Sequence, residues 1–228
     1  MKHCLRLLTC LVLALGAACT GLFTSNERPE QTYYLRAPAV PTPEGGLSPK
    51  AAPSLRVARP FADPGLDTTH LMLLEPDHRM SFYTGARWPA PMTEMVSALV
   101  VQTLRASGQW RSVADSGSPF PSDYLLQVTV RRFDADYTQG GPAPTVQVAL
   151  DCVIGRRDGR EVIGTFVVSG SAAAGENRLG AVVGAFEQAT DAALTALGSQ
   201  ALAVVSADAA RHAQNPPSPE ASSQRPSQ

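Results

Sequence analysis

The feature that most constrains the fold is an apolar side chain at every second position between Val146 and Ile154. The apolar positions in between are Val148, Leu150 and Cys152. A period of two is typical of a β-strand with one buried face and one solvated face. The segment therefore predicts a strand whose buried face carries Cys152.

Two neighbouring segments repeat this period. Residues 124–133 place Leu126, Val128 and Val130 on one face, and residues 162–169 follow the pair Asp158-Gly159. An Asp-Gly pair supplies the positive φ angles of a tight hairpin turn. The three segments predict an antiparallel meander with one dry face and one wet face.

Shorter strands are expected nearer the N-terminus. The β-prone segments are 33–36, 54–62, 69–74 and 80–84. A stretch rich in Pro, Gly and Ala at 37–53 predicts a loop, and the turn between the last two strands is expected at Pro76-Asp77.

Two segments change to the helical period. Between Met92 and Leu104 the apolar residues form one stripe, with Pro91 in the first turn and Gly108 just past the end. Apolar spacing from Leu179 to Ala201 predicts a second, longer helix with Asn177 as its N-cap. Two amphipathic helices covering one face of a mainly antiparallel sheet predict an α+β two-layer domain over residues 33–205. The proline-rich residues 206–228 predict a disordered tail.

The N-terminus predicts export. Residues 1–18 combine a basic start, a short apolar stretch and small residues that lead directly into Cys19. The apolar stretch is shorter than the roughly 20 residues that a membrane span needs. An uncleaved anchor and an ordinary secretory peptide cleaved near Ala18 are the alternatives, and Leu15 is not three residues before the cysteine as in the usual lipoprotein signal. We expect Cys19 to become the lipidated N-terminus of a tether formed by residues 19–32.

Cleavage would leave Cys152 as the remaining free cysteine. Cys4 and Cys10 leave with the signal peptide and Cys19 carries lipid, so an internal disulfide or a zinc site is not expected. The mature chain has 17 basic residues against 20 acidic ones, which gives no support for nucleic-acid binding.

The sequence lacks the motifs of the common hydrolases, metalloproteases, P-loop proteins and dinucleotide-binding enzymes. His70, His78 and His212 are scattered, so no metal site is expected. Asp134 and Asp136 could act as a pair of general acids and bases, but two acids at a strand end are more typical of a solvated turn. We expect no enzyme activity and no cofactor.

Three blocks of the sequence carry a resemblance to a known family. They are YTGARWPAPMTEMVSALVVQTLRASGQW at 83–110, YLLQVTVRRFDADY at 124–137 and LGAVVGAFEQATDAALTAL at 179–197. Together with the lipoprotein signal, their order and spacing resemble the ABC-type transport auxiliary lipoproteins over residues 33–202. The loop 37–53 and the C-terminal tail look like additions to the family pattern.

That resemblance implies a non-catalytic docking or receiving subunit of an intermembrane lipid transport system. The implied partners are a periplasmic MCE-domain protein and its inner-membrane ABC transporter, and some relatives assemble into homo-oligomeric rings. Thr20, rather than Asp, follows the cysteine, so the resemblance implies the periplasmic face of the outer membrane. The alternative function is a periplasmic lipid-binding lipoprotein that holds an acyl chain itself.

Six residues are candidates for an interface: Arg87, Trp88, Arg131, Arg132, Phe133 and Tyr137. Arg and Trp are enriched where proteins bind each other. The alternative is structural, with Trp88 packed at the start of the following helix and Arg87 paired with Asp134 or Asp136. Arg131 and Arg132 could contact anionic headgroups or simply solvate the wet face. Phe133 and Tyr137 could be contact residues or core edges.

Overall fold

The structure is a computed structural model that describes residues 30–39, 52–158 and 160–214. The predicted signal peptide, Cys19, Gly159, most of the tether, much of the loop 37–53 and the end of the tail lie outside these residues.

The three alternating segments form the long strands of the sheet. They are β7 (Tyr124–Asp136), β8 (Thr145–Arg156) and β9 (Glu161–Ala173), paired antiparallel in that order. The predicted meander is confirmed, and each strand runs a few residues further than its alternation. A register shift lies between Val130 and Arg132, so the alternation of β7 changes phase at Arg131.

The other edge of β7 pairs with three short strands in succession. All three run parallel to it, and they are β2 (Ser54–Val57), β3 (Phe61–Ala62) and β4 (His70–Leu74). The expected strand 54–62 is thus two strands, because Pro60 between them lacks the N–H that a continuous ladder needs. The sheet is therefore mixed: the long strands are antiparallel and the short ones join in parallel.

Three more strands extend the sheet beyond this edge. β5 (Met80–Arg87) forms the predicted hairpin with β4, β6 (Ser112–Ala114) lies beside β2, and β1 (Gln31–Thr32) runs parallel to the end of β5. The predicted strand 33–36 is wrong, since β1 precedes it and Leu35 lies buried in an extended segment. β6 was not predicted, because three residues carry too little periodicity.

The first helix has the predicted stripe and ends. α2 (Met92–Ala106) begins after Pro91 and is followed by Gly108, which has a φ of 64°. Only a residue without a side chain adopts that conformation freely, so Gly108 ends the helix.

The second helix is longer than predicted. α3 (Leu179–Gln214) continues beyond residue 206, where the tail was expected to begin. Asn177 is not its N-cap, because the position before Leu179 is Arg178 and the Asn177 side chain accepts a hydrogen bond from Tyr137. α3 is long and apolar enough to cross a membrane by length and composition. In this fold that apolar length covers the sheet.

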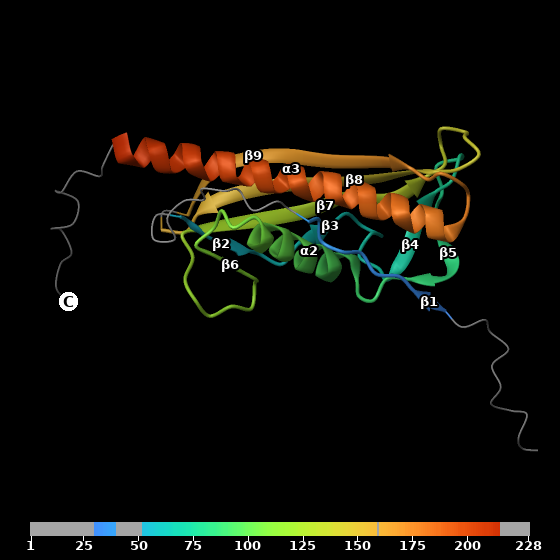
Figure 1. Cartoon of the computed structure of the whole chain (residues 1–228), viewed down its shortest axis with the longest axis horizontal. Coiled ribbons are helices and arrows are strands. Elements are labelled where there is room, and N and C mark those ends of the chain that lie inside the picture. Colours follow the sequence, from blue (N-terminus) through green and yellow to red (C-terminus); the bar gives the residue numbers. More distant parts are fainter. Residues whose placement is uncertain (1–29, 40–51, 159, 215–228) are drawn as a thin grey trace, which may run out of the picture. The chain divides into compact units, whose positions relative to one another are not determined.

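Both helices lie on one face of the sheet (Figure 1), so the predicted α+β two-layer class is confirmed. One shared core fills the space between the layers, with side chains from both helices and from the dry faces of β7 and β8. The described residues place no helix on the opposite face of the sheet.

Candidate interaction surface

The sheet face away from the helices carries exposed apolar side chains. The register places Leu125 of β7, Gly155 of β8 and Val162 of β9 in one row across the strands. Val162 is 60% exposed, and Val167 further along β9 is 64% exposed. On the other side of β7, Phe61 lies opposite Thr129 and is 63% exposed. Of these residues, Val162 has further apolar neighbours in Leu125 and Val153, and such a group of apolar side chains is a candidate for an interaction surface.

A groove of about 370 Å³ lies at one end of this face. We call it the meander groove, and it is lined by Leu125, Gln127, Val153, Gly155, Arg156, Arg157, Arg160, Glu161 and Val162. Its apolar floor comes from Leu125, Val153 and Val162. Arg157 and Arg160 are exposed at the turn between β8 and β9, and neither forms an ion pair within the described part of the chain. The groove thus combines an apolar floor with two free positive charges.

Arg131 lies on the same open face, as predicted for the wet side of the strand. It is half exposed, and it reaches Asp63 at 2.8 Å and Asp151 at 2.6 Å. Two acidic partners neutralise its charge, so Arg131 is less available to an anionic ligand than Arg157 or Arg160.

Arg132 has a structural environment. Its guanidinium donates to both oxygens of Asp134 at 3.1 and 2.7 Å and to Asp136 at 2.8 Å. Asp134 and Asp136 are only 5% and 6% exposed, so they are not the solvated turn that the sequence suggested. Burial raises the pKa of Asp136, but hydrogen bonds from Arg132 and Thr138 outweigh it and hold the pKa below its usual range. The arginine therefore compensates two buried charges.

Trp88 and Phe133 are fully buried in the core. The Trp88 ring meets Phe133 and Phe186 edge-on, with ring centroids 6.0 and 5.3 Å apart. Phe133 and Phe186 are stacked at 5.2 Å. The two residues pack the space between β7 and α3 where α2 begins, which agrees with the structural alternative. Arg87, at the end of β5, is half-buried.

Tyr137 links three parts of the fold. Its hydroxyl donates to Asn177 at 2.7 Å, and the Tyr83 hydroxyl lies 2.9 Å away. Burial and the hydrogen bond with Tyr137 raise the pKa of Tyr83 well above its usual range. This pair joins β5 to the end of β7 and to the residues before α3.

The histidines and the cysteine considered as possible ligands or nucleophiles do not form a common site among the described residues. Among the described residues, no group of three or more His, Cys, Asp or Glu side chains is placed to hold a metal ion. His70 stacks on Phe82, and His212 lies near Arg156 at the other end of the domain. Cys152 is buried, and burial together with the nearby Asp151 raises its pKa to about 12, so its thiol is unreactive near neutral pH.

The meander groove was not among the features predicted from the sequence. The sequence does contain an indication of this groove. Leu125, Val153 and Val162 are apolar at strand positions where a solvated face would carry polar side chains. A second missed feature is the buried Asp208 of α3, which accepts hydrogen bonds from Tyr124 at 3.1 Å and Arg156 at 2.8 Å. These contacts bind the last turns of α3 to the sheet. They explain why the helix continues past the expected end of the domain.

The family model described as "ABC-type transport auxiliary lipoprotein component" matches residues 33–210. The chain belongs to this family. As a member, it is an auxiliary lipoprotein component of ABC-type transport. No functionally curated protein matches the chain.

Solved structures support the fold. Protein XCC0632 from Xanthomonas campestris is 26% identical, with a TM-score of 0.71 over 79% of this chain and 99% of its own. An uncharacterized protein is 16% identical, with a TM-score of 0.59 over 76% of this chain and 99% of its own. The second likeness shows the fold alone.

Proposed function

We propose that the mature chain is a lipid-anchored, non-catalytic docking subunit of an ABC/MCE-type intermembrane lipid transport system. It would be held through Cys19 at the periplasmic face of the outer membrane and would receive the MCE-domain protein there. The observation that carries this proposal is the position of the meander groove, at the opposite end of the domain from the strand where the chain enters it.

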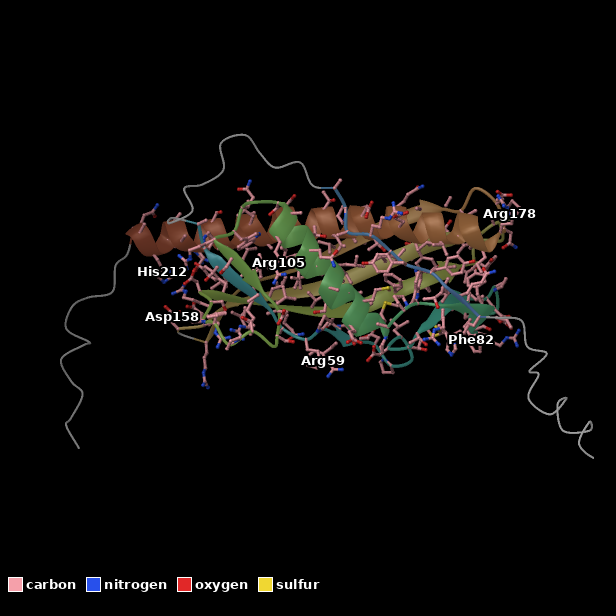
Figure 2. The ribbon with its side chains drawn as sticks, turned by 60° about the horizontal axis from the view of Figure 1, so that its bottom comes forward. Arg59, Phe82, Arg105, Asp158, Arg178 and His212 are labelled. Carbon is pink, nitrogen blue, oxygen red and sulfur yellow. The ribbon has the colours of Figure 1, made fainter. Side chains whose placement is uncertain are left out.

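The two ends are separated by the length of α3. Figure 2 shows Phe82 and Arg178 at one end and Asp158 and His212 at the other. At 1.5 Å per residue, the 36 residues of α3 span about 54 Å. Because β1 pairs with β5 at the Phe82 end, a lipid at Cys19 would anchor that end. The groove near Asp158 would then project away from the anchor, toward a partner that crosses the periplasm.

The chemistry of the groove suits a partner segment with apolar and acidic side chains. Leu125, Val153 and Val162 offer apolar area, and Arg157 and Arg160 offer charge without an acidic partner of their own. Opposite charge at the rim of an apolar contact speeds association and selects the partner.

The experiment is extraction of the tagged protein and its Cys19→Ser variant in detergent, followed by identification of what co-purifies. We expect the wild type in the outer membrane together with an MCE-domain protein. The variant should be soluble and come down without it. A wild type that is membrane-bound but never recovers an MCE-domain protein would contradict docking.

The second candidate is an acyl-chain carrier. It is favoured by the same groove, because a cavity of about 370 Å³ lies within the range of small-molecule sites. Native mass spectrometry distinguishes the two. A phospholipid retained by the wild type and lost in a Leu125→Glu variant would favour the carrier.

A further inference from the structure

The β4–β5 hairpin exposes apolar side chains at the end of the domain where the chain enters. Met80 and Phe82 are 50% and 49% exposed, and they alternate with Ser81 and Tyr83, so both point to the same side of β5. The His70 ring from β4 stacks on Phe82 with ring centroids 4.5 Å apart. We call Met80, Phe82 and His70 the hairpin patch.

The fold holds this patch in a fixed direction. On the opposite side of β5, the Tyr83 hydroxyl lies 2.9 Å from that of Tyr137, which is bonded in turn to Asn177. Met80 and Phe82 therefore cannot turn inward without breaking that chain of hydrogen bonds.

The patch lies close to the entry point of the chain. β1 pairs with the end of β5, where Gln31 is opposite Ala86. Phe82 is four residues from Ala86, about 14 Å along the strand. From Cys19 to Gln31 the chain has 12 residue steps, which reach at most about 43 Å when fully extended. A lipid on Cys19 therefore keeps the patch within reach of the bilayer.

We infer that the hairpin patch is a membrane-contact surface that lies against the lipid bilayer and orients the anchored domain. This inference rests on the lipid anchor of the proposed function. The tip of the hairpin supports contact through apolar side chains and not through charge, because Arg79 is paired with Asp77 at 2.6 Å and Glu75 at 2.8 Å. The patch is small, but a tether raises its local concentration at the membrane so that weak contacts suffice.

The test uses the full lipidated protein reconstituted into phosphatidylcholine vesicles with brominated acyl chains. Bromine quenches a tryptophan that enters the acyl region. The variant Phe82→Trp reports on the patch, and Phe120→Trp is the matched control. Phe120 is also an exposed phenylalanine, it lies outside the meander groove, and its carbonyl accepts a hydrogen bond from Arg56 beside the start of β7, at the far end of the domain. The native Trp88 and Trp110 are buried and give the same background in both variants.

We expect brominated lipid to quench the added tryptophan at residue 82 about two-fold, as for a side chain at the headgroup boundary, and to leave that at residue 120 unchanged. Adding Met80→Ser to the Phe82→Trp variant should reduce the quenching. Equal quenching at the two positions would overturn the inference.

The mass of the N-terminal peptide separates this outcome from failure of the proposed function. An acylated chain with equal quenching overturns only the membrane contact. A chain without acyl groups overturns the anchor and the membrane contact together. Quenching at residue 82 without recovery of an MCE-domain protein overturns docking and leaves the membrane contact standing.

Discussion

Arg131 and Arg132 are neighbours of the same type with different roles. The irregularity in β7 directs Arg131 to Asp63 and Asp151 on the surface, while Arg132 compensates two buried aspartates. A charge pair that is open to water contributes little to stability, whereas removing one partner from a buried cluster leaves an uncompensated charge. The two residues are therefore not interchangeable candidates for an interface.

Replacing Arg132 tests this difference. We expect Arg132→Ala to lower the free energy of unfolding by about 2–4 kcal/mol, because Asp134 and Asp136 would keep their burial without a counter-charge. The measurement is urea denaturation followed by circular dichroism. Arg131→Ala is the matched control and should leave the midpoint close to wild type. A stable Arg132→Ala that loses only partner binding would return this residue to the interface.

The acid dependence of stability follows from Asp136. Its pKa lies below the ordinary value of 3.8 in the folded protein, so its contribution to stability is present above that value. The contribution is lost as the pH falls below 3.8 and through the lower folded pKa. We expect Asp136→Asn to be less stable at pH 7 and to lose less of its remaining stability as the pH is lowered below 3.8. Parallel acid-unfolding curves for the two proteins would contradict this assignment.

Helix α3 shows at the scale of the element how the two layers meet. It lies so close to β9 that a side chain at Gly170 would stand 1.9 Å from the carbonyl oxygen of Ala189. Gly164 plays the same part further along, where a Cβ would stand 2.6 Å from Val204. Buried small residues of α3, such as Ala189 and Ala193, complete the close contact.

Substitution of Gly170 tests this packing. We expect Gly170→Ala to destabilise the domain by about 1–3 kcal/mol, because the backbone of α3 must move away from β9. Gly184→Ala is the matched control in α3. A Cβ there has no neighbour within 4 Å, so alanine should stabilise the helix by about 1 kcal/mol. Thermal unfolding of both variants gives the comparison, and a Gly170→Ala protein as stable as wild type would mean that the layers can separate freely.

The proposed membrane contact and the proposed docking site lie at opposite ends of the domain. The hairpin patch and β1 lie at the end with Phe82, while the meander groove and the end of α3 lie at the end with Asp158 and His212 (Figure 2). An elongated helix packed along the sheet keeps the two ends apart at a fixed distance. Such a domain can touch a membrane and a partner at the same time.

Variants in the groove should separate docking from folding. We expect Val162→Glu and Arg157→Glu to reduce recovery of the MCE-domain protein at least several-fold, because they place negative charge where an acidic and apolar segment would bind. Both residues are exposed, so the unfolding midpoint should change little. Gln102→Glu, an exposed substitution on α2, is the control for added charge. Unchanged recovery with the groove variants would exclude the groove as the docking site.

Local patterns determined much of this protein in advance. Alternation gave the three long strands and the burial of Cys152, and the helical stripe between Pro91 and Gly108 gave α2, because the periods of strands and helices are properties of neighbouring residues. The order and spacing of the sequence segments 83–110, 124–137 and 179–197 indicated the family. Tertiary structure alone decided which arginine serves two buried aspartates, where α3 ends and which apolar residues remain exposed. Those outcomes depend on contacts between residues far apart in the chain, such as Asp208 with Tyr124 and Gly170 with Ala189, and no local period encodes such contacts.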